Sequence, residues 1–472
     1  MQDIKNLKEK LFCSKKNLYF KIKDEEFEKS QIFAENYKNF LNYSKTERET
    51  VKFFVKKAKE NNFEEFDLNK KYKSGDRIFR INRNKSVIFA VIGENISREG
   101  FNIAVSHIDS PRIDLKPNPI YENNEMAFFK THYYGGIKKY QWTAIPLSLH
   151  GKIILKNQDS IEICIGENET EPCFYISDLL PHLAREQMSK IMSKAVEGEN
   201  LNILIGSLPF KSNLNLNSSS NLNSGSELVK LNILNILNKK YGITERDLSF
   251  AELELVPAFK ARDIGFDRSL IGSYGHDDRC CAFPAFEAIL NTKNPKKTCI
   301  TMLADKEEIG SDGNTGMKSL FFRYFLADLA SIDGIKTRYA LSKSKALSAD
   351  VDAAFDPNYA SSFDSLNSSF LNRGVVITKY TGSGGKFGAS DASAEFIGYI
   401  REIFEKNNIN YQFGQLGKVD TGGGGTVAKY VANLNIDVID VGITVLSMHS
   451  PFEVISKLDL YEMFKAVKAF FK

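Results

Sequence analysis

Apolar residues near the start of the chain recur every three or four positions, and further on they gather into shorter and denser runs. Between Asp24 and Phe63 the spacing is that of amphipathic helices. Short runs rich in β-branched and aromatic residues follow, and they predict a hairpin over 77–81 and 86–92 and a core strand over 101–105. The first part of the chain is therefore expected to consist of helices followed by a sheet.

The middle of the chain has a different pattern. Strand-like pieces over 153–155, 161–165 and 201–205 surround one helix predicted over 179–192. This part ends in 212–226, which consists almost wholly of Ser, Asn, Leu and Gly. Because such a segment cannot bury enough apolar surface to order itself, we interpret it as a mobile loop. A separate, β-rich domain is expected in this part of the chain.

Beyond residue 245, apolar strands alternate with helices. The strands are predicted at 299–303, 345–349 and 437–441, and the helices at 281–290 and 315–330. Alternation of this kind builds a mostly parallel sheet that is flanked by helices on both faces. We therefore expect an α/β domain made of 1–117 and 245–472, interrupted by an inserted domain over 118–244.

The composition narrows the class of protein. The 472 residues include 63 Lys and Arg against 59 Asp and Glu, and a net charge of +4 without segregation argues against a nucleic-acid partner. No run approaches the ~18 apolar residues of a membrane span, and Met1 to Phe20 lacks the apolar stretch of a signal peptide. Six cysteines form no CxxC pair. These features predict reduced, buried thiols in a cytoplasmic protein with no membrane partner.

One histidine stands out at the end of an apolar strand. His107 follows the predicted strand 101–105, and Asp109 lies two residues further on, on the same face by strand periodicity. This pairing suits a metal-binding imidazole whose tautomer is fixed by a neighbouring carboxylate. Taken alone, the pattern favours a hydrogen-bonded core histidine over a metal ligand.

Further candidate ligands lie at the ends of other predicted elements, namely Asp277 before helix 281–290, Glu307 and Glu308 after strand 299–303, Asp350 after strand 345–349, and His449 near the C-terminus. Each has a plain alternative, since Asp277 could be an N-cap acid and adjacent glutamates are usually solvated. Together they bring two histidines and at least three carboxylates to the edge where open α/β sheets bind ligands. Mixed imidazole and carboxylate ligands suit zinc, manganese or cobalt.

The clusters resemble, in order and spacing, the motifs of the aspartyl aminopeptidase and aminopeptidase I family of dinuclear metallopeptidases. The matching stretches are HIDSPR at 107–112, YGG at 134–136, HDDR at 276–279, EEIGS at 307–311, SADV at 348–351, GGGGT at 422–426 and MHSP at 448–451. The resemblance covers the chain from Asn102 to the C-terminus. It implies a zinc-exopeptidase-like catalytic domain, an inserted β-rich dimerisation domain, and an activity that removes N-terminal residues from peptides.

The resemblance also implies a role for each matching residue. It implies two divalent metal ions per subunit, with zinc expected first and cobalt or manganese as alternatives. The ligands would be His107 and Asp350 at one ion, Glu308 and His449 at the other, and Asp277 bridging the two. Glu307 would be the general base, and Asp109 the acid that orients His107.

Two more residues would contact the substrate. Lys379 lies where the family places a cation that meets acidic side chains; the alternative is an ordinary surface lysine. His182 belongs to the inserted domain, from which the family implies that a histidine reaches the active site of a partner; the alternative is an exposed histidine on a capped helix. Ala353 stands where many relatives have a histidine, and 381–391 departs from the aspartyl-specific pattern. Substrates with a neutral or apolar N-terminal residue therefore remain alternatives to substrates with an acidic one. The family implies a homo-oligomer built from dimers, with a dodecamer as one form.

Two other functions fit the same residues. A dipeptidase or carboxypeptidase could use the same two-metal crevice, and a catalytically silent peptide-binding scaffold could keep the fold. The intact Glu307–Glu308 pair and the five ligands favour an enzyme, because a silent descendant would be expected to lose at least one of them. The leading hypothesis is a metal-dependent aminopeptidase that acts on peptides.

Overall fold

The computed structural model describes residues 2–12, 16–211 and 227–472, and the chain divides into two compact units. The first unit comprises Met1–Asp109, Ala261–Met448 and Glu453–Lys472, and the second comprises Ser110–Lys260 with the short segment His449–Phe452. The predicted loop over 212–226 lies outside the described residues. No helix within the described ranges combines the length and the apolar character that a membrane crossing requires.

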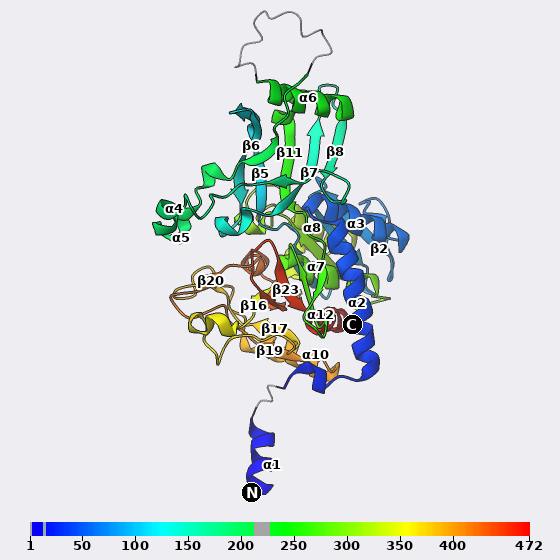
Figure 1. Cartoon of the computed structure of the whole chain (residues 1–472). Helices are drawn as coiled ribbons and strands as arrows, with labels where there is room; N and C mark the ends of the chain where they lie inside the picture. The colour runs from blue at the N-terminus through cyan, green and yellow to red at the C-terminus, as the bar shows by residue number, and fades with distance from the viewer. Residues whose placement is uncertain (1, 13–15, 212–226) are drawn as a thin grey trace, which may run out of the picture. The chain divides into compact units, whose positions relative to one another are not determined.

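A nine-stranded sheet forms the centre of the first unit (Figure 1). Its strands, in spatial order, are β1 (Glu64–Glu65), β2 (Arg77–Asn82), β3 (Ser86–Val91), β14 (Cys299–Ala304), β4 (Asn102–His107), β15 (Lys345–Ser348), β21 (Asp437–Gly442), β17 (Val375–Thr378) and β19 (Tyr411–Phe413). The neighbours β14, β4, β15 and β21 run parallel, so their carboxyl ends lie at one edge. The predicted mostly parallel sheet is confirmed.

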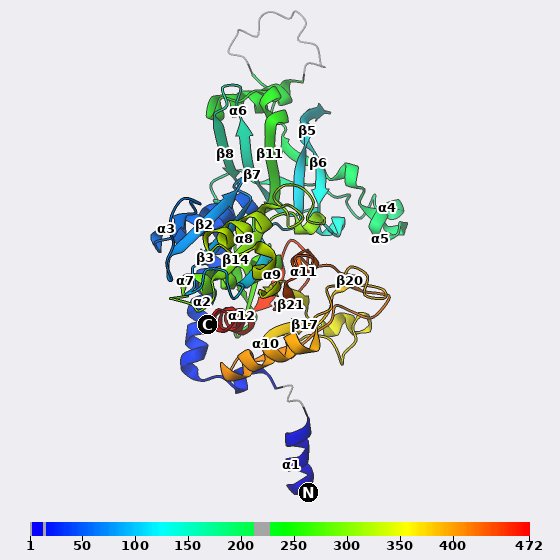
Figure 2. The ribbon, with the colours of Figure 1, turned by 180° about the vertical axis from the view of Figure 1, so that it is seen from behind.

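Helices cover both faces of this sheet, as Figures 1 and 2 show. One core contains residues of α2 (Asp24–Tyr43), α3 (Glu47–Glu60), α7 (His276–Leu290), α10 (Ala394–Lys406) and α12 (Lys457–Phe470), and the other contains residues of α8 (Phe321–Ile332), α9 (Thr337–Ser342) and α11 (Ala428–Ala432). On β3, Val87 and Phe89 belong to the first core, whereas Ile88 and Ala90 belong to the second. Successive side chains of a strand point to opposite faces, so a strand covered on both sides is apolar throughout.

A smaller, five-stranded sheet positions the segments that carry the predicted ligands. It consists of β12 (Arg262–Ile264), β13 (Leu270–Ser273), β23 (Glu453–Ser456), β22 (Thr444–Leu446) and β16 (Asp352–Ala353). β13 leads into Asp277, and β16 begins two residues after Asp350. The predicted metal ligands of the first unit are therefore held by regular structure on at least one side.

The second unit is built on seven strands, namely β5 (Arg112–Asn123), β6 (Met126–Tyr134), β7 (Pro146–Ile154), β8 (Ser160–Ile165), β9 (Phe174–Tyr175), β10 (Ile203–Gly206) and β11 (Ala251–Pro257). β11 pairs with both β5 and β7, and this closes the sheet into a small barrel. Helix α6 (Leu228–Tyr241) contacts β5, β6 and β10. Because β5 and β11 pair with these strands, they belong to this unit, although the sequence pattern placed the junctions at 117/118 and 244/245.

Three local predictions are wrong. The helix predicted over 179–192 is reduced to α4 (Arg185–Ser189) and α5 (Met192–Ala195). Pro181 disfavours the helical conformation of the residue before it, and Leu183 is exposed, so burial does not stabilise a longer helix. The helix predicted over 315–330 begins only at Phe321, since the preceding turn folds back tightly at Gly316, where a Cβ would lie 2.3 Å from the Ser311 oxygen. Of the described cysteines, all free, Cys164 and Cys173 are exposed rather than buried.

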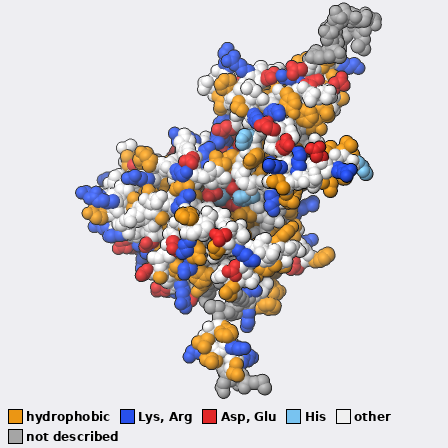
Figure 3. All heavy atoms as spheres, turned by 90° about the vertical axis from the view of Figure 1, so that its left-hand side faces the viewer, with side chains coloured by type: hydrophobic (Ala, Val, Ile, Leu, Met, Phe, Trp, Pro, Cys, Tyr) orange, Lys and Arg blue, Asp and Glu red, His pale blue; other side chains and the backbone are white. Residues whose placement is uncertain are grey.

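The remaining predictions of regular structure are confirmed. The helical stretch from Asp24 to Phe63 is α2 and α3, whose boundary is set by a capping box: the Thr46 side chain accepts a hydrogen bond from the N–H of Glu49, and the Glu49 side chain accepts one from the N–H of Thr46. The surface in Figure 3 carries basic and acidic side chains interspersed with one another, in keeping with the nearly balanced composition.

Candidate metal centre

His107 is the last residue of β4 and is almost fully buried, with 1% of its surface exposed. Its Nδ1 lies 3.0 Å from the backbone oxygen of Asp109. Since a carbonyl oxygen can only accept a hydrogen bond, Nδ1 carries the proton, and Nε2 is the nitrogen left for a metal. Nε2 lies 3.2 Å from Oδ1 of Asp277 and 3.8 Å from Oδ1 of Asp350. The imidazole therefore faces carboxylates, as a metal ligand would.

His107, Asp277 and Asp350 form one compact group, in which one ligand atom from each lies within 4.8 Å of the others. Burial raises the pKa of Asp350 well above its usual range; the charge of His107 opposes this rise, whereas Glu307 and Asp277 add to it. Burial opposes protonation of His107, but its carboxylate neighbours outweigh this and raise its pKa. Buried carboxylates this close repel one another, and a divalent cation would relieve that repulsion. The oxygen and nitrogen donors fit zinc and similar ions.

Asp277 enters the group from the start of α7. Its own backbone is not yet helical, and its N–H donates a hydrogen bond of 3.1 Å to Oε2 of Glu453. The preceding residue, His276, is fully buried between the backbone oxygen of Ile271, 3.1 Å from Nε2, and the hydroxyl of Tyr37, 3.0 Å from Nδ1. Burial lowers the pKa of His276 to about 3, so its ring is neutral. His276 is a core histidine that fixes the start of α7.

The two adjacent glutamates are held by Asp109. Its Oδ1 accepts a hydrogen bond of 3.1 Å from the N–H of Glu307, and its Oδ2 accepts one of 3.2 Å from the N–H of Glu308. Both glutamates lie in a 3₁₀ turn, Glu307–Ile309, that follows β14 after two residues. Because Nδ1 of His107 also lies beside Asp109, this acid links the imidazole to the turn that carries both glutamates.

Three further site residues were predicted, and each is described within its own unit. Lys379 follows β17 and is exposed. His182 is exposed in the second unit, between β9 and α4. His449 begins the short segment that packs with the second unit, where its Nδ1 lies 2.9 Å from the backbone oxygen of Gly136. The roles assigned to these three residues stay predictions.

One buried acid, close to the strand ends that carry the predicted ligands, was not identified from the sequence. Asp440 lies on β21, opposite Ser348 of β15 and Thr378 of β17. Its Oδ1 accepts a hydrogen bond of 2.7 Å from the hydroxyl of Thr426, which directly follows the four glycines at 422–425. Burial raises the pKa of Asp440 to about 6, and the hydroxyl groups of Ser348 and Thr426 lower it in part. The available signal was an acid inside the apolar run 437–441, since a buried carboxylate requires a partner.

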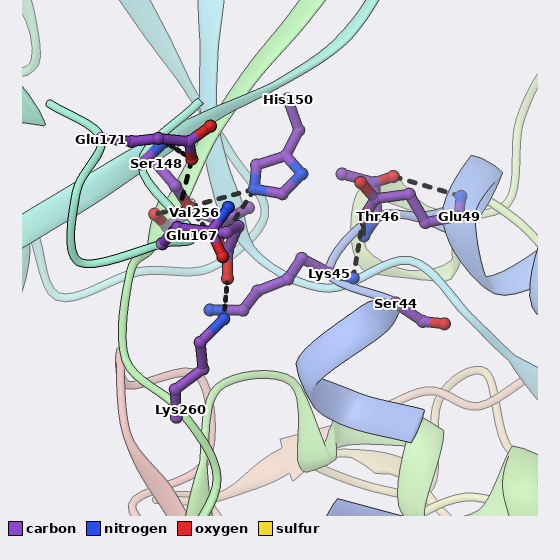
Figure 4. A network of polar contacts seen from close by, with 12 residues as sticks. Ser44, Lys45, Thr46, Glu49, Ser148, His150, Glu167, Glu171, Val256 and Lys260 are labelled. Carbon is purple, nitrogen blue, oxygen red and sulfur yellow. Dashed lines mark hydrogen bonds and ion pairs between the residues drawn. The ribbon is translucent and has the colours of Figure 1, made fainter. Parts of the chain in front are cut away.

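A further buried histidine, His150, belongs to a hydrogen-bonded group inside the second unit. Nε2 of His150 lies 3.0 Å from Oγ of Ser148 and 3.1 Å from Oε1 of Glu167 (Figure 4). The hydroxyl of Ser148 donates to the same Glu167 oxygen at 2.6 Å, and Oε2 accepts from Lys260 at 2.9 Å. Ser148 is fully buried, so this grouping satisfies polar atoms inside the unit and does not present a nucleophile to a substrate.

Comparison with known proteins supplies the family. A model of the aminopeptidase I zinc metalloproteases (M18) matches residues 40–471. A probable M18 family aminopeptidase 1 from Clostridium acetobutylicum is 47% identical over 463 residues, which cover 96% of this chain and 97% of the relative.

Two solved structures are also similar to this chain. The crystal structure of an M18 aminopeptidase from Thermotoga maritima superposes with a TM-score of 0.91 at 41% identity, covering 98% of this chain and 99% of that one. The crystal structure of aminopeptidase I from Clostridium acetobutylicum gives 0.89 at 43% identity, covering 98% and 100%. With a family model spanning most of its length and relatives matched almost end to end, the chain belongs to the M18 aminopeptidases, a family of zinc metalloproteases that hydrolyse peptides.

Proposed function

We propose that this metallo-aminopeptidase uses two divalent metal ions per chain to remove acidic or neutral N-terminal residues from peptides. The observation that carries the proposal is the link through Asp109 between His107, which faces Asp277 and Asp350, and the turn of the two glutamates. One acid thereby connects one candidate ligand group to the residues expected to complete the centre.

The second ion would be held by Glu308 and His449, with Asp277 shared between the two ions. The support for His449 as a ligand is its position along the chain. It directly follows Met448, the last residue of one segment of the first unit, and four residues later the chain returns to that unit at Glu453. Glu453 accepts a hydrogen bond from the backbone N–H of Asp277, so the chain that continues from His449 meets the proposed bridging residue within the first unit, at Glu453.

Zinc bound by these residues would acidify a water molecule and polarise the scissile carbonyl. Glu307, which is expected to remain free of the metal, would accept the proton of the attacking water and deliver it to the departing amine. Asp109 would hold Glu307 in place by accepting a hydrogen bond from the backbone N–H of Glu307. Asp109 would also keep the proton of His107 on Nδ1. The chain thus divides ligand, base and positioning roles among separate carboxylates.

The preferred first residue is a separate question. Lys379 is exposed beyond the end of β17, so it is available to meet an acidic substrate side chain. A lysine there would favour aspartyl or glutamyl substrates, whereas neutral or apolar ones would be accepted if Lys379 does not contact the first residue.

We further propose that the active form is a homo-oligomer built from dimers, in which His182 reaches the active site of a partner. The support is the apolar surface beside it: Leu179, Leu180 and Leu183 are 46%, 48% and 67% exposed. Exposed apolar residues gathered in one place mark interaction sites. The fold also occurs in the yeast aminopeptidase mApe1, which is described as a dodecamer.

The test of the metal centre combines metal analysis with a substrate panel. After chelation, zinc, cobalt or manganese is restored, and hydrolysis of aspartyl, glutamyl, leucyl and alanyl amides is measured. Asp277→Asn should lose both ions and all activity, whereas Asp267→Asn, a change in an exposed loop, should keep both. A full complement of metal in Asp277→Asn would contradict the bridging role.

The rival exopeptidases are separated by blocked peptides. An aminopeptidase should cleave a peptide that is amidated at its C-terminus and should reject the same peptide acetylated at its N-terminus. The opposite preference would indicate a carboxypeptidase, and a requirement for both free ends would indicate a dipeptidase. Inertness on every substrate with every metal would favour the scaffold.

A further inference from the structure

The second unit contains a partly open apolar cavity of about 490 Å³. Its walls come from the strands and from helix α6, which lies across them (Figure 2). Leu149 on β7, Ile163 on β8 and Leu253 on β11 line it from the sheet side, and each is no more than 5% exposed. The volume falls in the roughly 300–1,000 Å³ range of small-molecule sites, and the mouths of β-barrels are a frequent place for such sites.

Helix α6 covers the cavity loosely. Ile233 and Ile236 line the cavity from the helix, yet Ile236 is 50% exposed, and within α6 only Val229 is buried. The helix is held close to the strands at Gly206, where an added Cβ would lie 2.6 Å from Cδ1 of Ile233. The helix therefore touches the sheet at that contact and leaves space beside it.

The chemistry of the walls favours an alkyl chain over water. Leucine, isoleucine and phenylalanine side chains offer water few hydrogen-bond partners, whereas they offer a chain of methylenes close contacts. At the end of α6, Lys240 and Tyr241 also line the cavity. They supply an ammonium and a hydroxyl on one side of an otherwise apolar space, which is the pattern expected for an amphiphile with an anionic head.

A carboxylate lies near these two groups. Glu171 accepts hydrogen bonds from the N–H groups of Gly166 and Asn168, at 3.1 and 3.3 Å, and its charge acts on Lys240. Both backbone donors bind Oε2 of Glu171, and the larger interaction of Lys240 is with the side chain of Tyr241. Because an ammonium has three N–H donors, Lys240 can still pair with a ligand. A cationic head would be repelled by Lys240, and a neutral head would gain a hydrogen bond without an ion pair.

We propose that the second unit binds a single-chain anionic amphiphile, a saturated fatty acid of medium length, with its alkyl chain among Leu149, Ile163 and Leu253 and its carboxylate at Lys240. This site consists only of residues of the second unit, so it does not depend on the proposed two-metal function. It adds an apolar ligand to a protein whose family activity concerns peptides.

The direct test is isothermal titration of the full-length zinc-loaded protein with octanoate, decanoate and dodecanoate, each below its micelle concentration. Each buried methylene should tighten binding about fourfold, so dodecanoate should bind roughly two orders of magnitude more tightly than octanoate, until the cavity is full. Binding at one site per chain is expected. Dodecyltrimethylammonium, with the same chain and the opposite charge, should bind at least tenfold more weakly.

Two kinds of variant locate the ligand. Leu253→Trp and the milder Ile163→Phe should fill the cavity and abolish or sharply weaken dodecanoate binding, while peptide hydrolysis shows that the chain is still folded. Lys240→Gln should weaken dodecanoate binding about tenfold and leave dodecanol binding unchanged. Lys239→Gln, its exposed neighbour on α6, is the matched control and should bind as the wild type does.

Several results would overturn the proposal. These are the absence of saturable binding, affinity independent of chain length, undiminished binding in a folded cavity-filling variant, or equal losses in Lys240→Gln and Lys239→Gln. If Leu253→Trp does not fold, dodecanoate binding by Ile163→Phe tests whether the ligand occupies the cavity. If neither variant folds, the chain-length series and the two lysine variants still test the proposal.

Discussion

The carboxylate of Asp109 accepts a hydrogen bond from the backbone N–H of Glu307, with 3.1 Å between Oδ1 and N. Its other oxygen accepts from the N–H of Glu308 at 3.2 Å. One side chain, almost fully buried, therefore sets the backbone position of both the proposed general base and a proposed metal ligand. Side chains held in this way need little rearrangement when substrate binds.

This relationship predicts the effect of Asp109→Asn. An asparagine has one accepting oxygen, so its amide nitrogen would face one of the two backbone N–H groups, and the turn should shift. We expect metal affinity to fall about 10–100-fold, with a parallel loss of kcat. Competition with a chelator measures the first and peptide hydrolysis the second. Asp312→Asn, an exposed change in the following loop, is the control, and equal behaviour of the two variants would contradict the positioning role.

A second prediction separates the two glutamates. Glu307→Gln removes the proton acceptor but no proposed ligand, so metal content should be unchanged while kcat falls by about 10²–10⁴-fold. Glu308→Gln is the matched comparison, because the same chemical change one residue later should instead lower metal content. Metal analysis and steady-state kinetics on both variants test this prediction. Activity near that of the wild type in Glu307→Gln would remove this residue from the mechanism.

The strand ends could be predicted from sequence because their signals are local. His107, Glu307 and Asp350 each follow a short apolar run, and parallel strands bring their carboxyl ends to one edge. The hydrophobic pattern is sufficient to place such residues on the same side of a sheet. It does not reveal the side-chain contacts that decide which atoms meet.

The contacts that the sequence does not reveal are those with partners far away along the chain. His276 is adjacent to Asp277 and looks equally suited to a metal, yet its partner is Tyr37, more than two hundred residues away. Asp440 pairs with Thr426 across a loop and a helix. The prediction of a helix over 179–192 was wrong because apolar spacing alone does not show whether a surface exists for those residues to cover.

The hydroxyl of Thr426 provides a third prediction. It donates to Asp440 at 2.7 Å directly after the glycine segment, and Gly423 and Gly424 pair with Ser383 and Gly382. Thr426→Val should leave the buried carboxylate short of a donor and loosen this segment. We expect KM to rise several-fold with a smaller change in kcat, and a stability loss of about 1–3 kcal/mol. Thr426→Ser keeps the hydroxyl and should restore both values; if it does not, the hydrogen bond is not responsible.

The last prediction concerns pH and a residue on α12. Asp459 is fully buried and accepts hydrogen bonds of 2.7 Å from the N–H groups of Asn372 and Gly374. Burial raises the pKa of Asp459 from 3.8 to about 7, and these hydrogen bonds lower it in part. Because the folded pKa lies above the unfolded one, the folded state binds a proton more tightly. The stability that Asp459 contributes is therefore fully present below about pH 4 and is lost as the pH rises to about 7.

Asp459→Asn cannot titrate, so it should remove this part of the pH dependence. The amide can accept only one of the two backbone hydrogen bonds, so the variant should be less stable than the wild type at pH 5. At pH 8 the wild type carries the cost of the buried charge, at most ~4 kcal/mol, and the difference between the two proteins should shrink or reverse. Thermal unfolding at both pH values measures it, with the exposed change Asp364→Asn as the control. A difference that is the same at pH 5 and pH 8 would mean that Asp459 does not titrate between them in the folded protein.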